Sequence, residues 1–165
     1  MLIKCLETLS KFELLKEEVL AIVFKYENEK NQLSCQTTID NIGNWYDSVG
    51  SFSEIEEADE KRYNVIQPEL SGTYLEELIK KYSSYRTRIM ILNPKKCYSV
   101  HRDTSPRLHI PIITNMQSWM VWPHHNTNVH LNTGVIHWVD TTKHHTFFNG
   151  DSTLRRIHVI MNVDC

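Results

Sequence analysis

The chain has 165 residues, enough for one domain with a sizeable core and few for two. Its 41% hydrophobic and 23% charged residues, with only 5 Gly and 5 Pro, exclude a fibrous or disordered chain. The formal net charge of -2 hides an asymmetry, because residues 1–82 carry 9 Lys and Arg against 16 Asp and Glu, whereas residues 83–165 carry 9 against 4. Histidine, absent before residue 101, makes the second half rich in imidazole and poor in carboxylates.

The sequence contains no apolar run of the length of a membrane span, so we expect no membrane partner. Charged residues from Lys4 to Glu13 interrupt the apolar positions of the first segment, which is unlike a signal peptide. A cytoplasmic location is therefore predicted. The cysteines are far apart and form no CxxC pair, so free thiols are expected at all of them: Cys5, Cys35, Cys97 and Cys165.

From Leu2 to about Tyr26, apolar residues recur at three- and four-residue steps, which predicts one or two helices packed on a larger body. The following stretch, residues 27–67, is polar, turn-rich and acidic. It contains one acidic run that we expect to be solvated surface, made of Glu54, Glu56, Glu57, Asp59 and Glu60. These segments predict a supporting region ahead of the main body of the fold.

Thr73 and Glu76 form a T-x-x-E capping box, in which the Thr side chain and the Glu side chain each satisfy a backbone N–H at a helix start. Glu76 and Lys80 add a pair of opposite charges one turn apart, as do Glu77 and Lys81. The pattern predicts a helix from Tyr74 to about Tyr82.

Beyond this helix the pattern changes to short β-branched or aromatic runs separated by Asn, Pro, Gly, Asp and Thr. The predicted strands are Arg88–Leu92, Cys97–Arg102, Arg107–Ile113, Ser118–Trp122, Val129–Leu131, Val135–Val139, Thr146–Phe148 and Leu154–Val163. Their spacing of roughly ten residues is typical of a β-sandwich or barrel. We therefore expect one mainly β domain, with residues 1–85 as helical or irregular support and residues 86–165 as a double-sheet barrel.

The residues His101-Arg102-Asp103 are the first candidate site. In an extended segment, residues two apart point to the same side, so the imidazole of His101 and the carboxylate of Asp103 can converge while Arg102 turns away. His145 opens a later strand and could supply a third ligand, with His144 as the nearest rival. Two histidines and one carboxylate make the facial triad of non-haem Fe(II) oxygenases. A hydrogen-bonded His/Asp surface pair is the alternative.

The last predicted strand places Arg156 and His158 on one face and Arg155 on the other. A guanidinium inside a barrel is costly unless it meets an anion, and its fork suits a carboxylate. Arg107 and His109 repeat the same R-x-H pattern on an earlier strand. Together these pairs indicate a pocket for a dianion, whereas the alternative is a structural salt bridge from the inward arginine of the last strand to Asp140 or Asp151.

In order and spacing, several short motifs of the stretch from about Gly72 to Asp164 resemble the aspartyl/asparaginyl β-hydroxylase family of Fe(II)/2-oxoglutarate-dependent oxygenases. The matching pieces are Gly72-Thr73-Tyr74, Cys97-Tyr98-Ser99-Val100-His101-Arg102-Asp103, Pro106-Arg107-Leu108-His109-Ile110-Pro111-Ile112, Gly134 with Trp138-Val139-Asp140, His145-Thr146-Phe147-Phe148-Asn149-Gly150 and Arg156-Ile157-His158. The resemblance implies a double-stranded β-helix, the cupin-like jelly roll. It also implies iron bound by His101 and His145, and because this chain has Asp103, a full triad is expected.

The same resemblance implies that Arg107 and His109 contact the cosubstrate 2-oxoglutarate. It implies further that Arg156 of the final R-I-H binds the distal carboxylate of 2-oxoglutarate. The family's usual separation of ten residues from the second iron histidine would select Arg155 instead, but the R-I-H match and the strand alternation select Arg156. The implied reaction uses Fe(II), 2-oxoglutarate and O2, forms succinate and CO2, and hydroxylates an unactivated C–H bond of an amino-acid side chain.

The substrate expected from the resemblance is an Asp/Asn-type residue of a protein, or a free amino acid such as proline. A second class of function is a non-redox cupin-like metal-binding module or isomerase, which needs the metal ligands but no paired Arg/His groups beside them. A third class is a nucleic-acid or protein interaction module. Because the arginines of the second half are dispersed without a basic run, nucleic acid is the least favoured partner.

Overall fold

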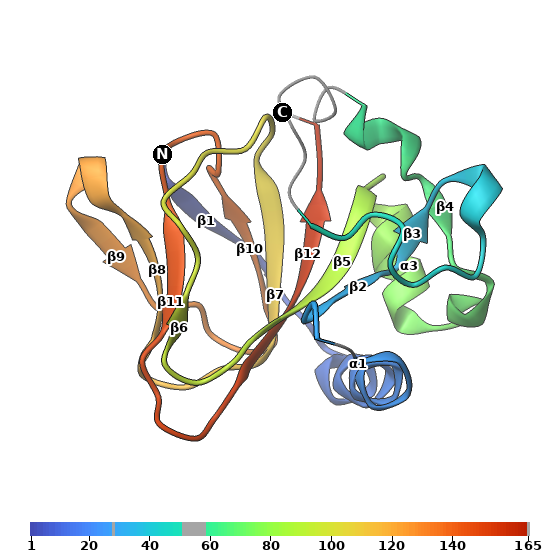
Figure 1. The fold of residues 1–165 in the computed structure, drawn as a ribbon, viewed down its shortest axis with the longest axis horizontal. Coiled ribbons are helices and arrows are strands. Elements are labelled where there is room, and N and C mark those ends of the chain that lie inside the picture. Colours follow the sequence, from blue (N-terminus) through green and yellow to red (C-terminus); the bar gives the residue numbers. More distant parts are fainter. Residues whose placement is uncertain (28, 51–58, 165) are drawn as a thin grey trace.

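The computed structural model describes residues 1–27, 29–50 and 59–164, in which two β-sheets face each other and helices cover the outer side of the larger sheet (Figure 1). The larger sheet has six strands in the order β1-β10-β7-β12-β5-β2. In that order they are Ile3–Thr8, Val135–Val139, Arg107–Ile113, Arg156–Asn162, Tyr85–Leu92 and Gln32–Ser34. The smaller sheet has four strands, β6-β11-β8-β9, which are Lys96–Cys97, Thr146–Asn149, Ser118–Trp122 and Thr127–Val129.

Strands β5 to β12 are distributed between the two sheets, and every pairing in both sheets is antiparallel. The order β10-β7-β12-β5 in one sheet and β6-β11-β8-β9 in the other is that of a double-stranded β-helix, or jelly roll. The predicted mainly β fold class with preceding helices is therefore confirmed. A separate short ladder joins β3 (Gln36–Thr37) to β4 (Val65–Ile66).

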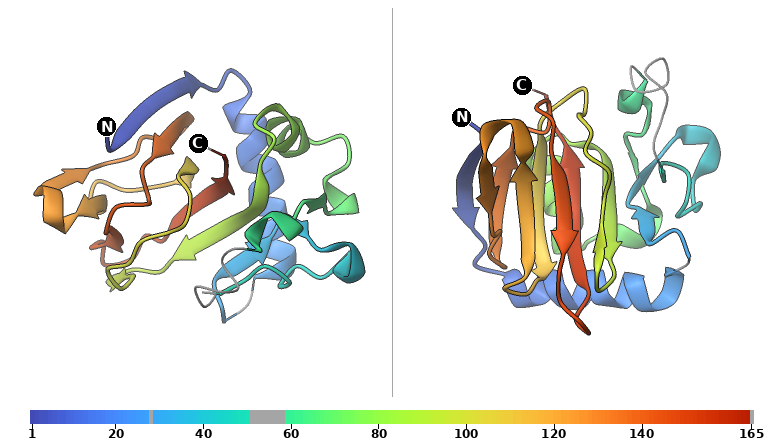
Figure 2. Two further views of the ribbon diagram at one scale, coloured as in Figure 1. Left: turned by 90° about the horizontal axis from the view of Figure 1, so that it is seen from above. Right: turned by 60° about the vertical axis from the view of Figure 1, so that its left-hand side comes forward.

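The helices α1 (Phe12–Tyr26) and α3 (Tyr74–Lys81) pack on the outer face of the larger sheet, which α1 crosses from one side to the other (Figure 2). Alternate residues of the central strands, such as Ile89, Ile110 and Val159, point to this face and join one apolar core with the helices. The 3-10 turns complete the described elements and are Ile39–Asn41, Glu60–Arg62, Pro68–Leu70 and Pro123–His125. The other set of alternate residues faces the smaller sheet and is more polar.

The predicted helix over residues 2–26 is correct only from Phe12 onward. Its buried stripe is the predicted one, Leu15, Val19, Ile22 and Val23. Residues Ile3–Thr8 instead form β1, which pairs with β10 at the edge of the larger sheet. The apolar spacing of this segment also fits a helix, but the hydrogen-bonding edge of β10 decides its structure, and local propensity is a weak constraint against such pairing.

Helix α3 begins where the capping box predicts. The Thr73 side chain accepts a hydrogen bond from the Glu76 backbone N–H at 3.1 Å, and the Glu76 carboxylate accepts one from the Gly72 N–H at 2.8 Å. Leu75, Leu78 and Ile79 turn inward against the core. The cap therefore fixes which face of the helix meets the sheet.

Replacing Thr73 with alanine is expected to lower the free energy of unfolding by about 1 kcal/mol. The reason is that the first turn of α3 loses the side-chain oxygen that accepts the Glu76 N–H. Urea titration followed by circular dichroism measures this change. The matched control is Ser71→Ala, which lies on the exposed turn just before the cap. Equal stability of the Thr73 variant and the control would contradict the role of the cap.

Three strand predictions differ from the structure by one to three residues at an end, since β5 begins at Tyr85, β11 ends at Asn149 and β12 covers Arg156–Asn162. Two others differ further. The run Cys97–Arg102 pairs only at β6 and then at the isolated bridge between His101 and His145. The strand predicted at Val129–Leu131 lies slightly earlier, as β9. In both cases the chain is leaving a sheet for a turn, where tertiary pairing rather than composition sets the end of the strand.

The acidic run contains one residue that is not surface. Asp59 is exposed, but the expectation of a solvated side chain is wrong for Glu60, which is 3% exposed, and Glu54, Glu56 and Glu57 lie outside the described residues.

The cysteines at positions 5, 35 and 97 are free thiols, as predicted, and Cys165 lies outside the described part. Among the described helices, none combines the length and apolarity needed to cross a membrane.

Candidate metal centre

A cavity of about 550 Å³ lies between the two sheets, and it brings together every site residue predicted from the sequence. These residues are His101, Asp103, Arg107, His109, His145 and Arg156. They come from β7, β12 and the two chain segments that carry the isolated bridge. The cavity is therefore built by the double-stranded β-helix itself.

His101, Asp103 and His145 offer ligand atoms that all lie within 4.8 Å of one another. The two histidines face each other because their backbones form reciprocal N–H···O bonds of 3.0 and 2.8 Å. The Asp103 carboxylate oxygens lie 3.9 Å from Nε2 of His101 and 3.7 Å from Nε2 of His145. This metal-ligand group has the composition of a facial triad.

The histidine rings of the metal-ligand group are oriented by backbone carbonyls. Nδ1 of His101 donates to the carbonyl of Ser99 at 2.7 Å, and Nδ1 of His145 donates to the carbonyl of Lys143 at 2.9 Å. Such bonds fix the tautomer and leave Nε2 as the lone-pair nitrogen that a metal needs. Burial lowers the pKa of His145, so this imidazole is neutral at neutral pH. The donor set thus fits Fe(II) or a similar divalent metal.

His144, the rival ligand, lies outside this group. Its side chain is exposed, and its ring is 5.1 Å from that of His124. His145 is 5% exposed and its ring lies 4.5 Å from that of His101. The strand that starts at residue 146 therefore turns one of the two adjacent histidines into the cavity and the other away.

Arg156 is 1% exposed and lines the same cavity. Its guanidinium lies 3.8 Å from the ring centroid of Phe147, and Nη2 is 2.8 Å from Nδ1 of His158. Nε and Nη1 have no hydrogen-bond partner among the described residues. Burial lowers the pKa of Arg156 to about 10, which still leaves it charged at neutral pH. A buried cation with free donors is a site for an anion.

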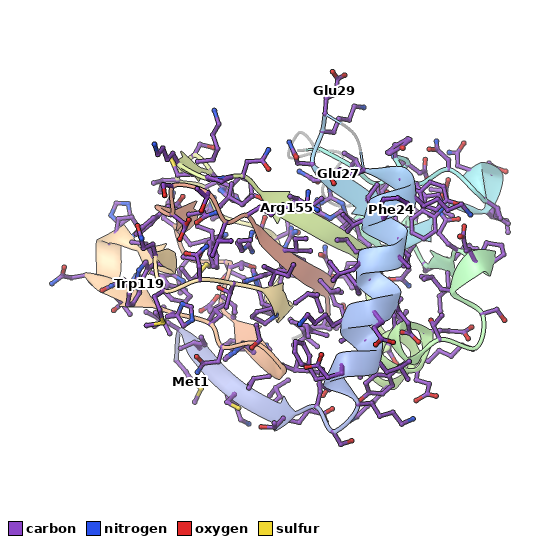
Figure 3. All side chains as sticks on the ribbon, turned by 90° about the horizontal axis from the view of Figure 1, so that it is seen from below. Met1, Phe24, Glu27, Glu29, Trp119 and Arg155 are labelled. Carbon is purple, nitrogen blue, oxygen red and sulfur yellow. The ribbon has the colours of Figure 1, made fainter. Side chains whose placement is uncertain are left out.

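The alternative salt bridges from Arg156 to Asp140 or Asp151 do not form. The Asp140 carboxylate accepts from Thr142, and the Asp151 carboxylate accepts backbone N–H bonds from the turn that precedes β12. Arg155 points the other way and pairs with Glu27 at 2.6 Å, next to the end of α1 on the outside of the molecule (Figure 3).

Arg107 and His109 face the cavity in two different states. The Arg107 guanidinium pairs with Asp103 at 2.9 Å, whereas both ring nitrogens of His109 lack a partner among the described residues. Burial, followed by the charge of Arg156, lowers the pKa of His109 well below its usual value. His109 is therefore a neutral group whose ring nitrogens are available to a ligand, and Arg107 already orients the Asp103 carboxylate of the candidate metal-ligand group.

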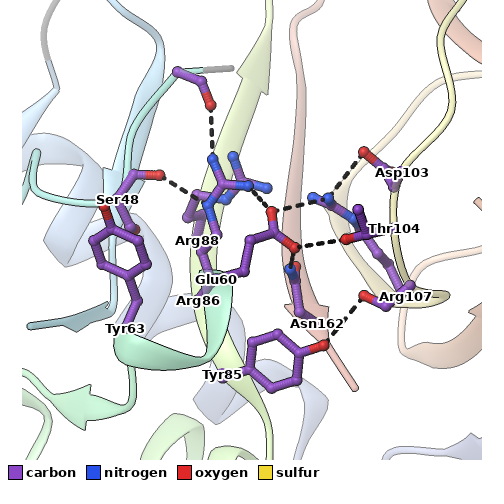
Figure 4. Close-up of polar contacts among 12 residues, drawn as sticks. Ser48, Glu60, Tyr63, Tyr85, Arg86, Arg88, Asp103, Thr104, Arg107 and Asn162 are labelled. Atoms are coloured by element: carbon purple, nitrogen blue, oxygen red, sulfur yellow. Dashed lines mark hydrogen bonds and ion pairs between the residues drawn. The ribbon is translucent and has the colours of Figure 1, made fainter. Parts of the chain in front are cut away.

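Glu60 is the centre of a buried polar network next to the metal-ligand group (Figure 4). Its carboxylate pairs with Arg86, accepts from Arg107 at 3.4 Å and accepts from the Asn162 amide at 2.7 Å. Arg86 has a φ of 50°, a backbone conformation rare for a residue with a side chain. The contacts of its side chain hold that conformation in place, which is common near functional sites.

The sequence-based predictions do not include Arg86 and Arg88, which are buried and line this cavity, or Glu60, which is buried beside Arg86. Arg86-Thr87-Arg88 has the same two-residue alternation as the R-x-H pairs, and this pattern could have identified both arginines. Glu60 has no comparable local pattern. It is distinguished from its acidic neighbours only by the packing of its 3-10 turn against β5.

We expect Glu60→Gln to lower the affinity for a divalent metal by about 10-fold, the lower end for loss of an outer-shell partner. Without the Glu60 charge, Arg107 pairs more fully with Asp103 and competes with the metal. Calorimetric titration with Mn(II) measures the change, and Asp164→Asn, on the exposed pair with Lys61, is the matched control. An unchanged Kd in the Glu60 variant would show that the network does not act on the metal ligands.

No protein-family model matches the chain, and no curated protein matches it. Among solved structures, a viral collagen prolyl hydroxylase from Paramecium bursaria Chlorella virus-1 is similar with a TM-score of 0.54 and 12% identity, covering 99% of this chain and 91% of that chain. Its complex with 2-oxoglutarate gives a TM-score of 0.51 and 10% identity over 99% of this chain and 97% of that chain.

NgTET1 in complex with 5mC DNA is also similar, with a TM-score of 0.56 and 14% identity over 98% of this chain and 72% of that chain. At these identities the similarity shows the fold, and both comparisons extend over nearly the whole chain. They therefore confirm the double-stranded β-helix.

Proposed function

We propose that this protein is an Fe(II)/2-oxoglutarate-dependent dioxygenase that hydroxylates an unactivated C–H bond of an amino-acid side chain. One observation carries the proposal: a His/Asp/His group and a buried arginine with free donors line the same cavity. The structural neighbours include a prolyl hydroxylase in complex with 2-oxoglutarate, and this supports the same reaction type here.

Each residue has a definite part in this proposal. Nε2 of His101, Nε2 of His145 and the Asp103 carboxylate hold the metal, and the carbonyls behind the rings keep them in place. Arg156 binds the distal carboxylate of 2-oxoglutarate, and neutral His109 donates to the cosubstrate. When bound, Fe(II) supplies the chemistry that couples oxidation of 2-oxoglutarate by O2 to succinate and CO2 with hydroxylation of the substrate.

Arg107 takes a different role from the one that the family resemblance implies. Its guanidinium is already shared between Asp103 and Glu60, which leaves it less free to bind 2-oxoglutarate directly. We assign it to orienting the metal-binding carboxylate. The buried ring of Phe147, against which Arg156 stacks, helps to exclude water from the cosubstrate end of the cavity.

A non-redox metal-binding module of the cupin type is the second candidate. It would explain the metal-ligand group, but it gives no reason for a buried Arg156 beside it whose Nε and Nη1 have no partner in the described part of the chain. An uncompensated buried charge is costly, so a ligand anion is the better explanation.

Incubation of the iron-loaded protein with 2-oxoglutarate in air tests the proposal. Succinate is expected to form even without the natural substrate, at a slow uncoupled rate, and to depend on added Fe(II). Protein that holds iron but neither binds 2-oxoglutarate nor converts it would exclude the oxygenase and favour the non-redox module.

A further inference from the structure

Arg88 is a second buried arginine of the cavity that has no ion pair among the described residues. It lies on β5, is 3% exposed and lines the cavity beside Arg86 (Figure 4). Its one hydrogen bond among the described residues joins Nη1 to the Gln32 side-chain oxygen at 3.3 Å, and Nε has no partner. Gln32 is neutral, so the Arg88 guanidinium has no ion pair there.

The charges around the cavity leave an excess of positive charge. Within residues 1–27, 29–50 and 59–164, two buried or nearly buried carboxylates, Asp103 and Glu60, face four buried arginines: Arg86, Arg88, Arg107 and Arg156. Burial, together with the charges of Arg86 and Arg107, lowers the pKa of Arg88 well below its usual value. Fe(II) and the 2-oxoglutarate dianion cancel each other, so the excess remains when both are bound.

The backbone positions of Arg88 and Arg156 lie farther apart than the two ends of one small dianion, and the two side chains contact different neighbours. In the ladder between β12 and β5, Arg156 is opposite Leu92 and Arg88 is opposite Ile160. That offset of four residues is about 13 Å along the strands. A five-carbon dicarboxylate spans about 5 Å between its end carbons. Moreover, the Arg156 guanidinium lies on Phe147, whereas Arg88 reaches toward the β2 edge.

We propose that Arg88 binds a carboxylate of the substrate, so that the enzyme acts on a molecule or side chain that carries this group. The inference rests on the proposed function, since it assigns Arg156 to the cosubstrate and Arg88 to the substrate. A planar carboxylate matches the guanidinium fork, and at 3% exposure only a group that enters the cavity reaches Arg88. The carboxylate is either the α-carboxylate of a free amino acid or the side chain of an acidic residue in a peptide.

The test measures binding to protein loaded with redox-inert Mn(II) and 2-oxoglutarate. The probes are free L-proline and L-aspartate with their α-carboxamides, and acetyl-aspartyl methylamide with its asparaginyl counterpart. Thermal shift and tryptophan fluorescence report binding, and the variants are Arg88→Met, Arg88→Lys and the control Arg155→Met, whose side chain pairs with Glu27 outside the cavity. We expect a carboxylate probe to bind the wild type at least 10-fold more tightly than its amide. Arg88→Met should abolish this preference, Arg88→Lys should restore part of it, and Arg155→Met should retain it.

The unliganded Arg88→Met protein separates a ligand-binding role from a structural one. Loss of an unmatched buried charge should leave its melting temperature unchanged or higher, whereas loss of a structural partner would lower it. Equal binding of carboxylates and amides, binding of no carboxylate probe by the wild type, or unaltered preference in Arg88→Met would overturn the inference.

Titration of the Mn(II)-loaded wild type and variants with 2-oxoglutarate keeps this failure separate from failure of the proposed function. If the wild type and Arg88→Met both bind 2-oxoglutarate but no carboxylate preference exists, only the assignment of Arg88 fails. If Arg88→Met loses 2-oxoglutarate and Arg156→Met keeps it, Arg88 is the cosubstrate anchor and the inference is wrong. If the metal-loaded wild type does not bind 2-oxoglutarate, the proposed function itself fails.

Discussion

His145→Ala is expected to lower the affinity for Fe(II) or Mn(II) by more than 100-fold, because it removes a ligand rather than an outer-shell partner, whose loss costs about 10–100-fold. The remaining His101 and Asp103 supply only two of the three protein ligands of the group. His101→Ala and Asp103→Ala should act in the same direction. Metal content after gel filtration and calorimetric titration measure the effect.

His144→Ala is the matched control for this experiment. It removes the same imidazole from the adjacent position, where the side chain is exposed and lies beside His124. Metal affinity should remain within about twofold of the wild type, since surface substitutions of this kind are nearly neutral. Loss of metal in His144→Ala with retention in His145→Ala would move the site by one residue.

Arg156→Met is expected to raise the Kd for 2-oxoglutarate by about 30- to 5,000-fold, equivalent to about 2–5 kcal/mol for truncating one partner of a buried charged pair. Methionine fills most of the volume of the side chain and contacts Phe147, but it donates no hydrogen bond. Metal binding should be retained, because Arg156 is not part of the metal-ligand group. Titration of the Mn(II)-loaded protein with 2-oxoglutarate measures the change.

Arg155→Met supplies the comparison at the neighbouring position. Its guanidinium pairs with Glu27 outside the cavity, so the Kd for 2-oxoglutarate should not change. The opposite outcome, weaker binding of 2-oxoglutarate only in the Arg155 variant, would show that the strand directs Arg155 into the cavity in solution. Without 2-oxoglutarate, Arg156→Met should be at least as stable as the wild type, because the buried guanidinium has no ion pair with any residue that the structure describes.

The sequence predicts most of the barrel because its strands carry their own local pattern. The strands Arg107–Ile113, Ser118–Trp122 and Val135–Val139 match the predicted bounds. The helix after Thr73 is equally local, since the capping box lies within four residues. By contrast, residues Ile3–Thr8 become a strand only through β10, which is distant in sequence. A local sequence pattern cannot identify a pairing strand that is distant in sequence.

In the candidate site too, the residues that follow a local sequence pattern are predicted, and the residue brought in by packing is not. Alternation on a strand brings Arg156 and His158 to one face, and the pattern His101-Arg102-Asp103 places two potential ligands together. Glu60 enters the site from a turn in the acidic first half, and the sequence offers no sign that this one carboxylate is buried while Asp59 is exposed. The acidic first half and the basic second half thus meet in the folded protein, because the acidic half supplies a counter-ion to Arg86 and Arg107.

The position of β12 has a consequence for how the molecule is made. It is the last strand in sequence order, yet it lies in the middle of the larger sheet, between β7 and β5. A chain emerging from the ribosome therefore holds two half-sheets with open edges until residues 156–162 are available. Pairing at such long range is slow and exposes strand edges to aggregation. The sheet that builds the cavity can close only after synthesis of β12, so the metal-ligand group and Arg156 come together late in folding.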